Sequence, residues 1–320
     1  MKLLITKEST LEIKGIAILM VIIGHVSSRY GSSVLNYMGA FGVALFLFIS
    51  GYGLVMSYNK NGLNNFFKKR FINVFIPYVA ITTIWIIFDL IKGKIYSLKT
   101  YVLLLIGFDY NRTIDETMWY ISFILLWYII FYIIFKCTNK NLLRVILLFS
   151  VSFIFYKFQE TGIMMNFSWQ WYLHAFTFPI GVVAATYLKE GISPKTAIAL
   201  NIISLILIIF LLNKIQESMY VYISINIIIA VFMITLVIIK NSRRKSSNGL
   251  CLVGKYSYEL YLVEGYSMKI FLSSSNRNLA LLVYIIAVIS LSYIIKKVFN
   301  IAFGKNMLKE KSNNSILNLE

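Results

Sequence analysis

The stretch KGIAILMVIIGH, residues 14–25, decides the fold. Ten small or apolar residues separate Lys14 from His25, so the whole interval suits lipid hydrocarbon, yet it ends on a titratable side chain. It lies in an apolar run at about 13–29, and a run of about 17–25 such residues is the length that crosses a bilayer. The chain therefore opens with a predicted membrane helix that carries a histidine.

The rest of the chain repeats this pattern. Of the 320 residues, 59% are hydrophobic and 14% are charged, and the mean hydropathy is +0.75, which a soluble domain could not cover with polar surface. We predict an all-α, polytopic transmembrane bundle of about ten spans. They are expected at about 13–29, 38–58, 71–92, 118–136, 142–158, 171–189, 195–212, 219–240, 251–272 and 279–299. The apolar stretch 101–110 is too short to cross and predicts an interfacial or re-entrant piece.

The formal net charge of +18 does not indicate nucleic-acid binding, because the basic residues lie in short segments between apolar runs. With a cytoplasmic N-terminus, 21 of the 31 Lys and Arg residues fall on the inner side and 8 on the outer side. Both termini are therefore expected to be cytoplasmic. We predict one integral membrane domain at 1–300, with membrane lipid around it, and a short basic cytoplasmic tail at 301–320. A composition rich in Ile, Lys and Asn favours a bacterial plasma membrane.

Lys14 and His25 are candidate functional residues because they share one helical face. Eleven residues make about three turns, which separates the two side chains by about 16 Å along the axis. That spacing suits the two ends of one long ligand, and ionisable groups inside a membrane often mark function. The alternative is that His25 is a hydrogen-bonded interfacial residue and Lys14 a positive anchor.

Four stretches together resemble a known family of membrane enzymes. They are KGIAILMVIIGHV (14–26), FGVALFLFISGYGL (41–54), FFKKRFINVFIPY (66–78), and the pair MWYISFILLWY (118–128) and GKYSYELYLVEGY (254–266). Their order and spacing resemble the membrane acyltransferase 3 family, which O-acylates sugars and cell-envelope polysaccharides. The resemblance covers nearly the whole chain.

The resemblance implies roles for particular residues. His25 matches the family's essential histidine and would act as the base. Lys14 matches the basic residue of the same motif, and with Lys69 and Arg70 it would bind the phosphates of acyl-coenzyme A. The family often has a second arginine three residues after the first, and this chain has Asn73 there. A purely topogenic role for the basic cluster is the alternative.

The C-terminal motif of the family appears as Ser257, Tyr258, Tyr261 and Leu262, followed by Glu264 where many relatives have a histidine. By its position along the span, Glu264 is expected at a depth like that of His25. A carboxylate there would orient the imidazole, as a third group commonly does beside a base. Pairing of Glu264 with Lys269 or another bundle residue is the alternative.

Trp119, Tyr120 and His174 are candidate acceptor-binding residues. Aromatic side chains stack on sugar rings, but Trp and Tyr also collect at membrane interfaces for physical reasons, so an aromatic belt is the alternative. Asp109, Asp115 and Glu116 are expected to be solvated charges of the long outer loop. With two histidines and no metal-ligand motif, no metal site is expected.

The sequence thus predicts an O-acyltransferase with no bound cofactor. It would take an acyl group, expected to be acetyl, from acetyl-CoA or another acyl-CoA. The acceptor would be a hydroxyl of a capsular or other surface polysaccharide or its lipid-linked precursor. Two rivals stay open. One is a polysaccharide exporter, flippase or small-molecule transporter without acyl transfer, and the other is a non-catalytic partner in an envelope-synthesis complex.

Overall fold

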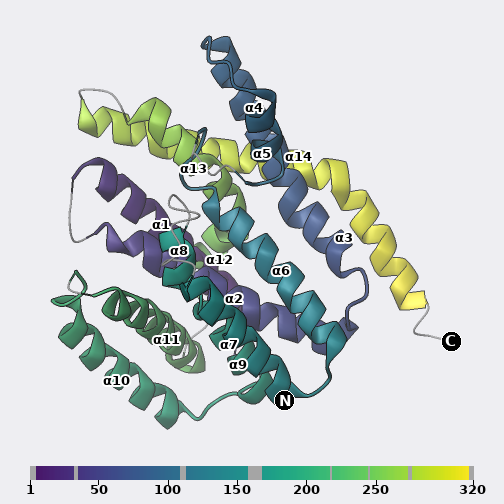
Figure 1. Cartoon of the computed structure of the whole chain (residues 1–320), viewed down its shortest axis with the longest axis vertical. Helices are drawn as coiled ribbons and strands as arrows, with labels where there is room; N and C mark the ends of the chain where they lie inside the picture. The colour runs from purple at the N-terminus through teal and green to yellow at the C-terminus, as the bar shows by residue number, and fades with distance from the viewer. Residues whose placement is uncertain are drawn as a thin grey trace.

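The fold is described by a computed structural model that covers residues 5–31, 35–108, 113–157, 168–216, 218–243, 246–272 and 276–316, with backbone alone at 168, 243 and 304–316. The described residues form helices and no strand (Figure 1). In chain order these are α1 (Lys7–Arg29), α2 (Tyr37–Asn61), α3 (Phe66–Arg70), the π-helical turn η1 (Phe71–Phe75), α4 (Ile76–Ile91), α5 (Leu98–Leu105), α6 (Trp119–Cys137), α7 (Asn141–Lys157), α8 (Ser168–His174), α9 (Thr177–Tyr187), α10 (Pro194–Leu212), α11 (Met219–Arg243), α12 (Asn248–Lys255), α13 (Ser257–Phe271) and α14 (Arg277–Ile316). The all-helical fold class is confirmed.

Seven helices in the described part of the chain are long and apolar enough to cross a membrane. They are α1, α2, the continuous run α3–η1–α4, α6, α10, α11 and α14. The other three expected spans are helical too. One forms the 17-residue α7, one divides into α8 and α9, and one divides into α12 and α13. The count of ten and the side of the termini stay predictions, while the short α5 occupies the stretch that is too short to cross.

The break between α8 and α9 follows from Pro179, the third residue of α9. Proline has no N–H and its ring collides with the carbonyl four residues earlier, which here belongs to Ala175. That carbonyl instead accepts a hydrogen bond of 2.8 Å from the Ser152 hydroxyl of α7. The break therefore ties α7 to the α8–α9 pair and sets the position of His174 at the end of α8.

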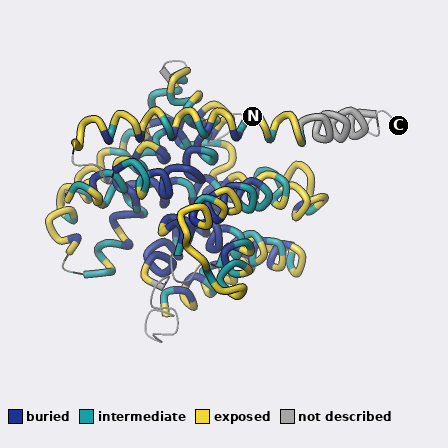
Figure 2. The backbone as a smooth tube through the Cα atoms, turned by 90° about the horizontal axis from the view of Figure 1, so that it is seen from above, coloured by how far each residue is buried: buried dark blue, intermediate teal, exposed yellow. Residues whose placement is uncertain are grey.

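Glycines let the central helices approach closely. A side chain at Gly24 of α1 would collide with the backbone of Gly39 on α2, and one at Gly51 of α2 would collide with the backbone of Phe178 on α9. In the same way, Gly254 of α12 lies against the backbone of α1 at Leu11. Small residues allow such contacts between membrane helices. Figure 2 shows buried residues toward the centre of the molecule and exposed residues at its periphery, and α2 is the most buried of the seven long apolar helices.

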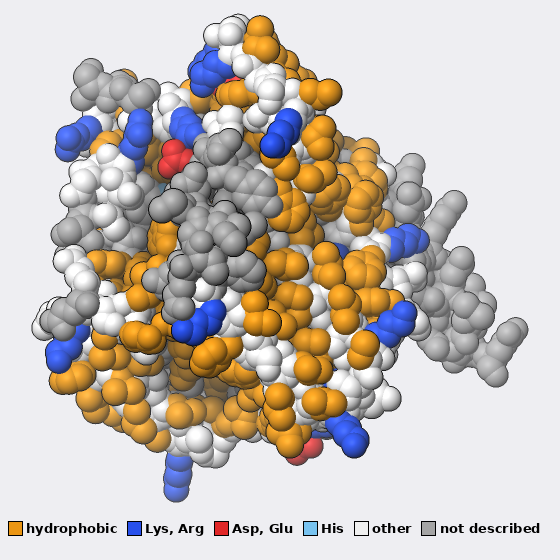
Figure 3. Space-filling view, viewed as in Figure 1, with side chains coloured by type: hydrophobic (Ala, Val, Ile, Leu, Met, Phe, Trp, Pro, Cys, Tyr) orange, Lys and Arg blue, Asp and Glu red, His pale blue; other side chains and the backbone are white. Residues whose placement is uncertain are grey.

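The outer surface is largely apolar. Figure 3 shows hydrophobic side chains across the face of the molecule, with many of the visible Lys and Arg side chains toward its rim. Helices α10 and α14 are the least buried of the seven long apolar helices, and α10 packs mainly on α11. Apolar helix faces of this kind fit contact with lipid rather than water.

A buried carboxylate fastens one end of α1. Glu12 is fully buried, and its Oε1 accepts hydrogen bonds from the Lys240 ammonium and the Ser247 N–H. Its Oε2 accepts a bond of 2.7 Å from the Asn241 amide. These three donors come from α11 and the start of the α12 region, so Glu12 links the first helix to the C-terminal half of the chain.

Candidate functional site

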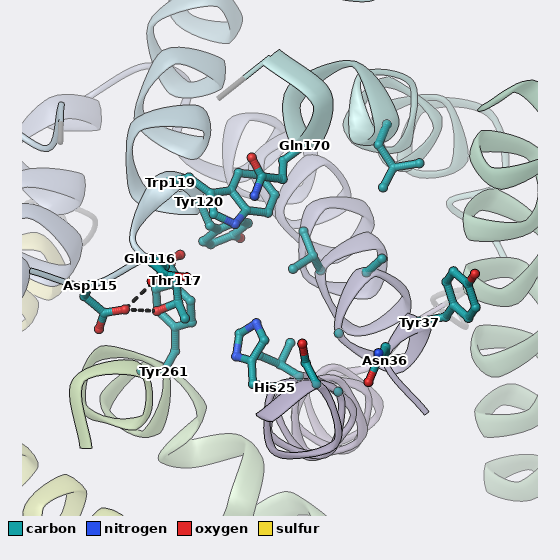
Figure 4. Close-up of a pocket in the computed structure, with 18 of the residues that line it drawn as sticks. His25, Asn36, Tyr37, Asp115, Glu116, Thr117, Trp119, Tyr120, Gln170 and Tyr261 are labelled. Atoms are coloured by element: carbon teal, nitrogen blue, oxygen red, sulfur yellow. Dashed lines mark hydrogen bonds between the residues drawn. The ribbon is translucent and has the colours of Figure 1, made fainter. Parts of the chain in front are cut away.

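The His25 cavity has a volume of about 600 Å³ and lies where α1, α2, α6, α8 and α13 meet. Figure 4 shows the His25 ring pointing into it from α1, with Trp119 and Tyr120 of α6 on the opposite wall. The His25 side chain is 27% exposed. That exposure leaves the imidazole accessible from the cavity while the helix around it is packed.

His25 and Glu264 form a direct pair. The His25 Nδ1–H donates to Glu264 Oε1 at 2.7 Å, and the carboxylate is fully buried on α13. The Tyr284 hydroxyl of α14 donates to the other oxygen, Oε2, at 3.4 Å. The pairing with Glu264 fixes the Nδ1–H tautomer and leaves Nε2 as the basic nitrogen, the arrangement that a general base requires. Lys269, the alternative partner considered for Glu264, instead donates to the Ile114 carbonyl at 2.7 Å.

The three candidate acceptor residues share the wall that faces His25. Trp119, Tyr120 and His174 all line the His25 cavity. The rings of Trp119 and His174 are stacked, with centroids 5.7 Å apart and planes 14° apart. His174 is buried, and its Nδ1 has no hydrogen-bond partner among the described residues. These aromatic residues therefore line the interior of the bundle rather than a belt on its surface.

Asp115 corrects one expectation. It is buried, not solvated, and its Oδ1 accepts hydrogen bonds from the Thr117 N–H at 2.9 Å and the Thr117 hydroxyl at 2.7 Å (Figure 4). Gly265 of α13 makes room for this carboxylate, because a side chain there would collide with it. Burial, and then the neighbouring charge of Glu264, raise the pKa of Asp115 to about 6. Glu116 is exposed as expected, and Asp109 lies outside the described residues.

The Lys14 cavity, of about 630 Å³, lies beside the other half of α1. Its polar lining includes Lys14, Ser50, Asn73, Lys255 and Lys296. The Lys296 ammonium is paired with Glu259 at 3.0 Å. Lys14 has no hydrogen bond or ion pair with the described residues. The Lys14 ammonium lines the cavity within range of the charges of Lys296 and Glu259.

A neck separates the two cavities. Val21, Val43, Tyr120 and Tyr261 line both of them. The Tyr120 and Tyr261 rings meet edge to face, with centroids 5.6 Å apart. The Tyr261 hydroxyl also donates to the Thr117 carbonyl, which anchors this ring to the segment that carries Asp115. Lys14 and His25 thus line two adjacent cavities that share these four residues, which we call the neck.

Lys69 and Arg70 lie outside the lining of the Lys14 cavity, although the Arg70 guanidinium is 5.8 Å from the ring centroid of Tyr128, which lines it. Lys69 is exposed, and the Arg70 guanidinium packs over the Phe66 ring, 4.2 Å from its centroid. Neither lines the Lys14 cavity, whereas Asn73 does. Lys255 and Lys296, which sequence reasoning did not assign to the site, supply the other cations there. Lys255 lies in the family-like motif at 254–266, and Lys296 lies in the last apolar run. These positions could have indicated that both lysines belong to the site.

The described part of the chain shows no group of three or more His, Cys, Asp or Glu residues that could hold a metal ion.

Comparison with known protein families gives one finding. A family model described as an acyltransferase domain, of the acyltransferase 3 type, matches residues 12–297. The match runs from α1 to α14 and includes every residue that lines the two cavities except Leu11, Phe299, Asn300 and Phe303. Neither the curated proteins nor the solved structures compared with the chain include a match to it.

Proposed function

The chain belongs to the acyltransferase 3 family, and from that premise we propose that it is a membrane O-acyltransferase. The donor is acyl-CoA, with acetyl as the expected group, and the acceptor is a hydroxyl of a surface polysaccharide or its lipid-linked precursor. The observation that carries the proposal is the His25–Glu264 pair in the wall of a cavity that meets the Lys14 cavity at a neck.

The reaction follows from the chemistry of this pair. His25 Nε2 takes the proton of the acceptor hydroxyl as its oxygen attacks the thioester carbonyl. The carbon–oxygen bond forms, the carbon–sulfur bond breaks, and the imidazolium returns the proton to the departing thiolate. Glu264 stabilises the imidazolium between these two steps. Such acid–base assistance typically contributes about 10²–10⁴-fold, and positioning contributes more.

The Lys14 cavity supports an anionic donor. Lys14, Lys255 and Lys296 line it, and one of them, Lys14, has no counter-charge in direct contact. The axial distance of about 16 Å from Lys14 to His25 suits a long flexible arm that ends in a thioester. Coenzyme A has this design, with phosphates at one end and the thiol at the other. On the predicted orientation the Lys14 cavity faces the cytoplasm, where acyl-CoA is made.

The His25 cavity supports a sugar acceptor. Its far wall carries the stacked Trp119 and His174 rings, together with Tyr120. Aromatic faces bind the apolar faces of sugar rings. An acceptor held there would bring a hydroxyl toward His25.

The test compares wild type with His25→Ala in the host, at equal membrane abundance, by measuring O-acetyl groups on the surface polysaccharide. Ile23→Ala is the matched control, because Ile23 lies two residues away on an exposed part of α1. Loss of acetyl groups with polysaccharide still exported supports the proposal. Loss of the polysaccharide itself would favour an exporter or flippase, and unchanged acetylation would reject a catalytic His25.

A further inference from the structure

The helix run from α3 to α4 contains an irregular turn that changes its backbone hydrogen bonds. At η1 the Ile76 N–H donates to the Phe71 carbonyl, five residues back rather than four. The next residue, Pro77, has no N–H, so the Ile72 carbonyl that would follow in the series receives no hydrogen bond from it. Single π-helical turns of this kind occur frequently at functional sites.

This turn faces the Lys14 cavity. Ile72, Asn73, Val74 and Pro77 all line it. The Tyr258 hydroxyl, which lines the same cavity from α13, donates to the Val74 carbonyl at 2.6 Å. One carbonyl of the turn is therefore already bound by a donor from the cavity side.

Because Pro77 cannot donate to it, the Ile72 carbonyl needs another donor. Backbone polar groups inside a membrane must be satisfied by protein, by water in a cavity or by a ligand, because lipid offers no hydrogen bonds. Ile72 and Asn73 line the Lys14 cavity together with its cations, and this cavity shares Tyr120 and Tyr261 with the His25 cavity. A ligand that fills the Lys14 cavity and reaches toward His25 therefore lies against the turn.

We propose that the turn at 71–77 is a binding site for the pantetheine arm of the donor, with the carbonyl left open by Pro77 accepting an amide N–H of that arm. The inference rests on the proposed function. The pantetheine arm fits because it is narrow, uncharged and carries two secondary amides between the phosphates and the sulfur. The turn thereby distinguishes an acyl-pantetheine thioester from simpler thioesters of equal reactivity.

The test uses the full chain in lipid nanodiscs and measures binding of acetyl-CoA by calorimetry. Two analogues each replace one pantetheine amide with an ester, which removes one N–H and keeps the shape. For wild type, one of the two esters should bind about fivefold more weakly than acetyl-CoA, the usual effect of one neutral hydrogen bond. Pro77→Ala supplies an N–H at 77 to the open carbonyl, so it should weaken acetyl-CoA binding by a similar factor.

The decisive comparison combines the two changes. In Pro77→Ala, the sensitive ester analogue should bind no more weakly than acetyl-CoA, because the bond is already lost. Ile84→Ala, on a lipid-exposed position of α4, serves as the control and should bind like wild type. Equal wild-type affinity for acetyl-CoA and both esters would overturn the inference, even if Pro77→Ala does not fold. If the ester analogue binds Pro77→Ala more weakly than acetyl-CoA does, by the same factor as in wild type, the inference is also overturned. If wild type binds no acetyl-CoA, the proposed function itself is overturned.

Discussion

Glu12 and Glu264 are both fully buried glutamates, yet their surroundings differ. Glu12 accepts hydrogen bonds from Lys240, Asn241 and the Ser247 backbone, so both of its oxygens are occupied by fixed donors. Glu264 bonds to an imidazole that opens onto a cavity and, more loosely, to the Tyr284 hydroxyl.

The difference indicates how to tell a structural role from a chemical role for a buried carboxylate in this bundle. Burial alone marks both residues as costly, because a charge away from water must be compensated. A carboxylate saturated by fixed donors holds helices together. A carboxylate whose main partner can gain or lose a proton, and can reach a ligand, is suited to chemistry. Replacement by glutamine should therefore lower turnover at one position and stability at the other.

Glu264→Gln should have the largest effect on turnover. Glutamine keeps the shape and can still accept the Nδ1–H of His25, but it removes the negative charge that stabilises the imidazolium. We expect acyl transfer to fall by about 100-fold with little change in melting temperature. Single-turnover transfer from acetyl-CoA measures it. Full activity in Glu264→Gln would remove the carboxylate from the mechanism and make the two glutamates alike.

Glu12→Gln should instead lower stability. The change leaves Lys240 without its counter-charge and replaces an acceptor oxygen with an amide, so unfolding should become easier by about 1–3 kcal/mol. The lower part of that range is favoured because the Lys240 side chain is 39% exposed. The melting temperature in detergent measures it. Activity per folded molecule should match wild type, and a specific loss of turnover would contradict the contrast.

Tyr284→Phe should lower turnover by less than Glu264→Gln does. The hydroxyl bonds to Glu264 Oε2 at 3.4 Å, and both side chains are buried. Removal of this bond leaves the carboxylate held by His25 alone, so turnover should fall about fivefold while KM for the donor stays unchanged. Steady-state kinetics separates the two constants. A change confined to KM would argue against a positioning role for Tyr284.

Asp115→Asn should have the smallest effect, and one that depends on pH. The buried carboxyl has its pKa raised from 3.8 to about 6, so the folded state holds the proton more tightly than the unfolded state. The contribution of Asp115 to wild-type stability is therefore fully present below about pH 4 and is lost as the pH rises through about 6. Asparagine does not ionise, so its stability relative to wild type should increase over this window and be constant above it.

Melting curves of both proteins from pH 4 to 8 measure this difference. The negative charge of ionised Asp115 lies near Glu264 and Lys269, which also shape the profile, so Lys269→Met is the useful companion. A difference in melting temperature that does not change with pH would show that Asp115 does not titrate in this range.

Much of the site could be predicted from the sequence. Part of it depends on the periodicity of a single helix, and part depends on two residues lying at the same depth in two different helices. The spacing of Lys14 and His25 placed them on one face, and the position of Glu264 along its span gave the depth of its contact with His25. The aromatic character of the outer span ends indicated Trp119, Tyr120 and His174, with support from the family resemblance for the first two, and all three line the same cavity.

The rest depends on how helices cross, which a single sequence does not encode locally. Asp115 looked like a loop charge, and only the opposing Gly265 allows it to be buried. Lys69 and Arg70 matched a basic motif, but neither lines the Lys14 cavity, whereas Asn73 and the Arg70 neighbour Tyr128 do. The break at Pro179 likewise divides one expected span, because Ser152 supplies the hydrogen bond that makes the break stable.

The neck of Val21, Val43, Tyr120 and Tyr261 has an electrical consequence for the proposed reaction. Moving one elementary charge through a membrane potential of 100 mV changes its energy by about 2.3 kcal/mol. The phosphates of the donor remain on the Lys14 side throughout, and the acceptor remains on the His25 side. When His25 returns the acceptor's proton to the thiolate, a neutral acetyl group has moved one way and a neutral hydrogen the other. Each turnover is then electroneutral, and the membrane potential neither drives nor opposes it.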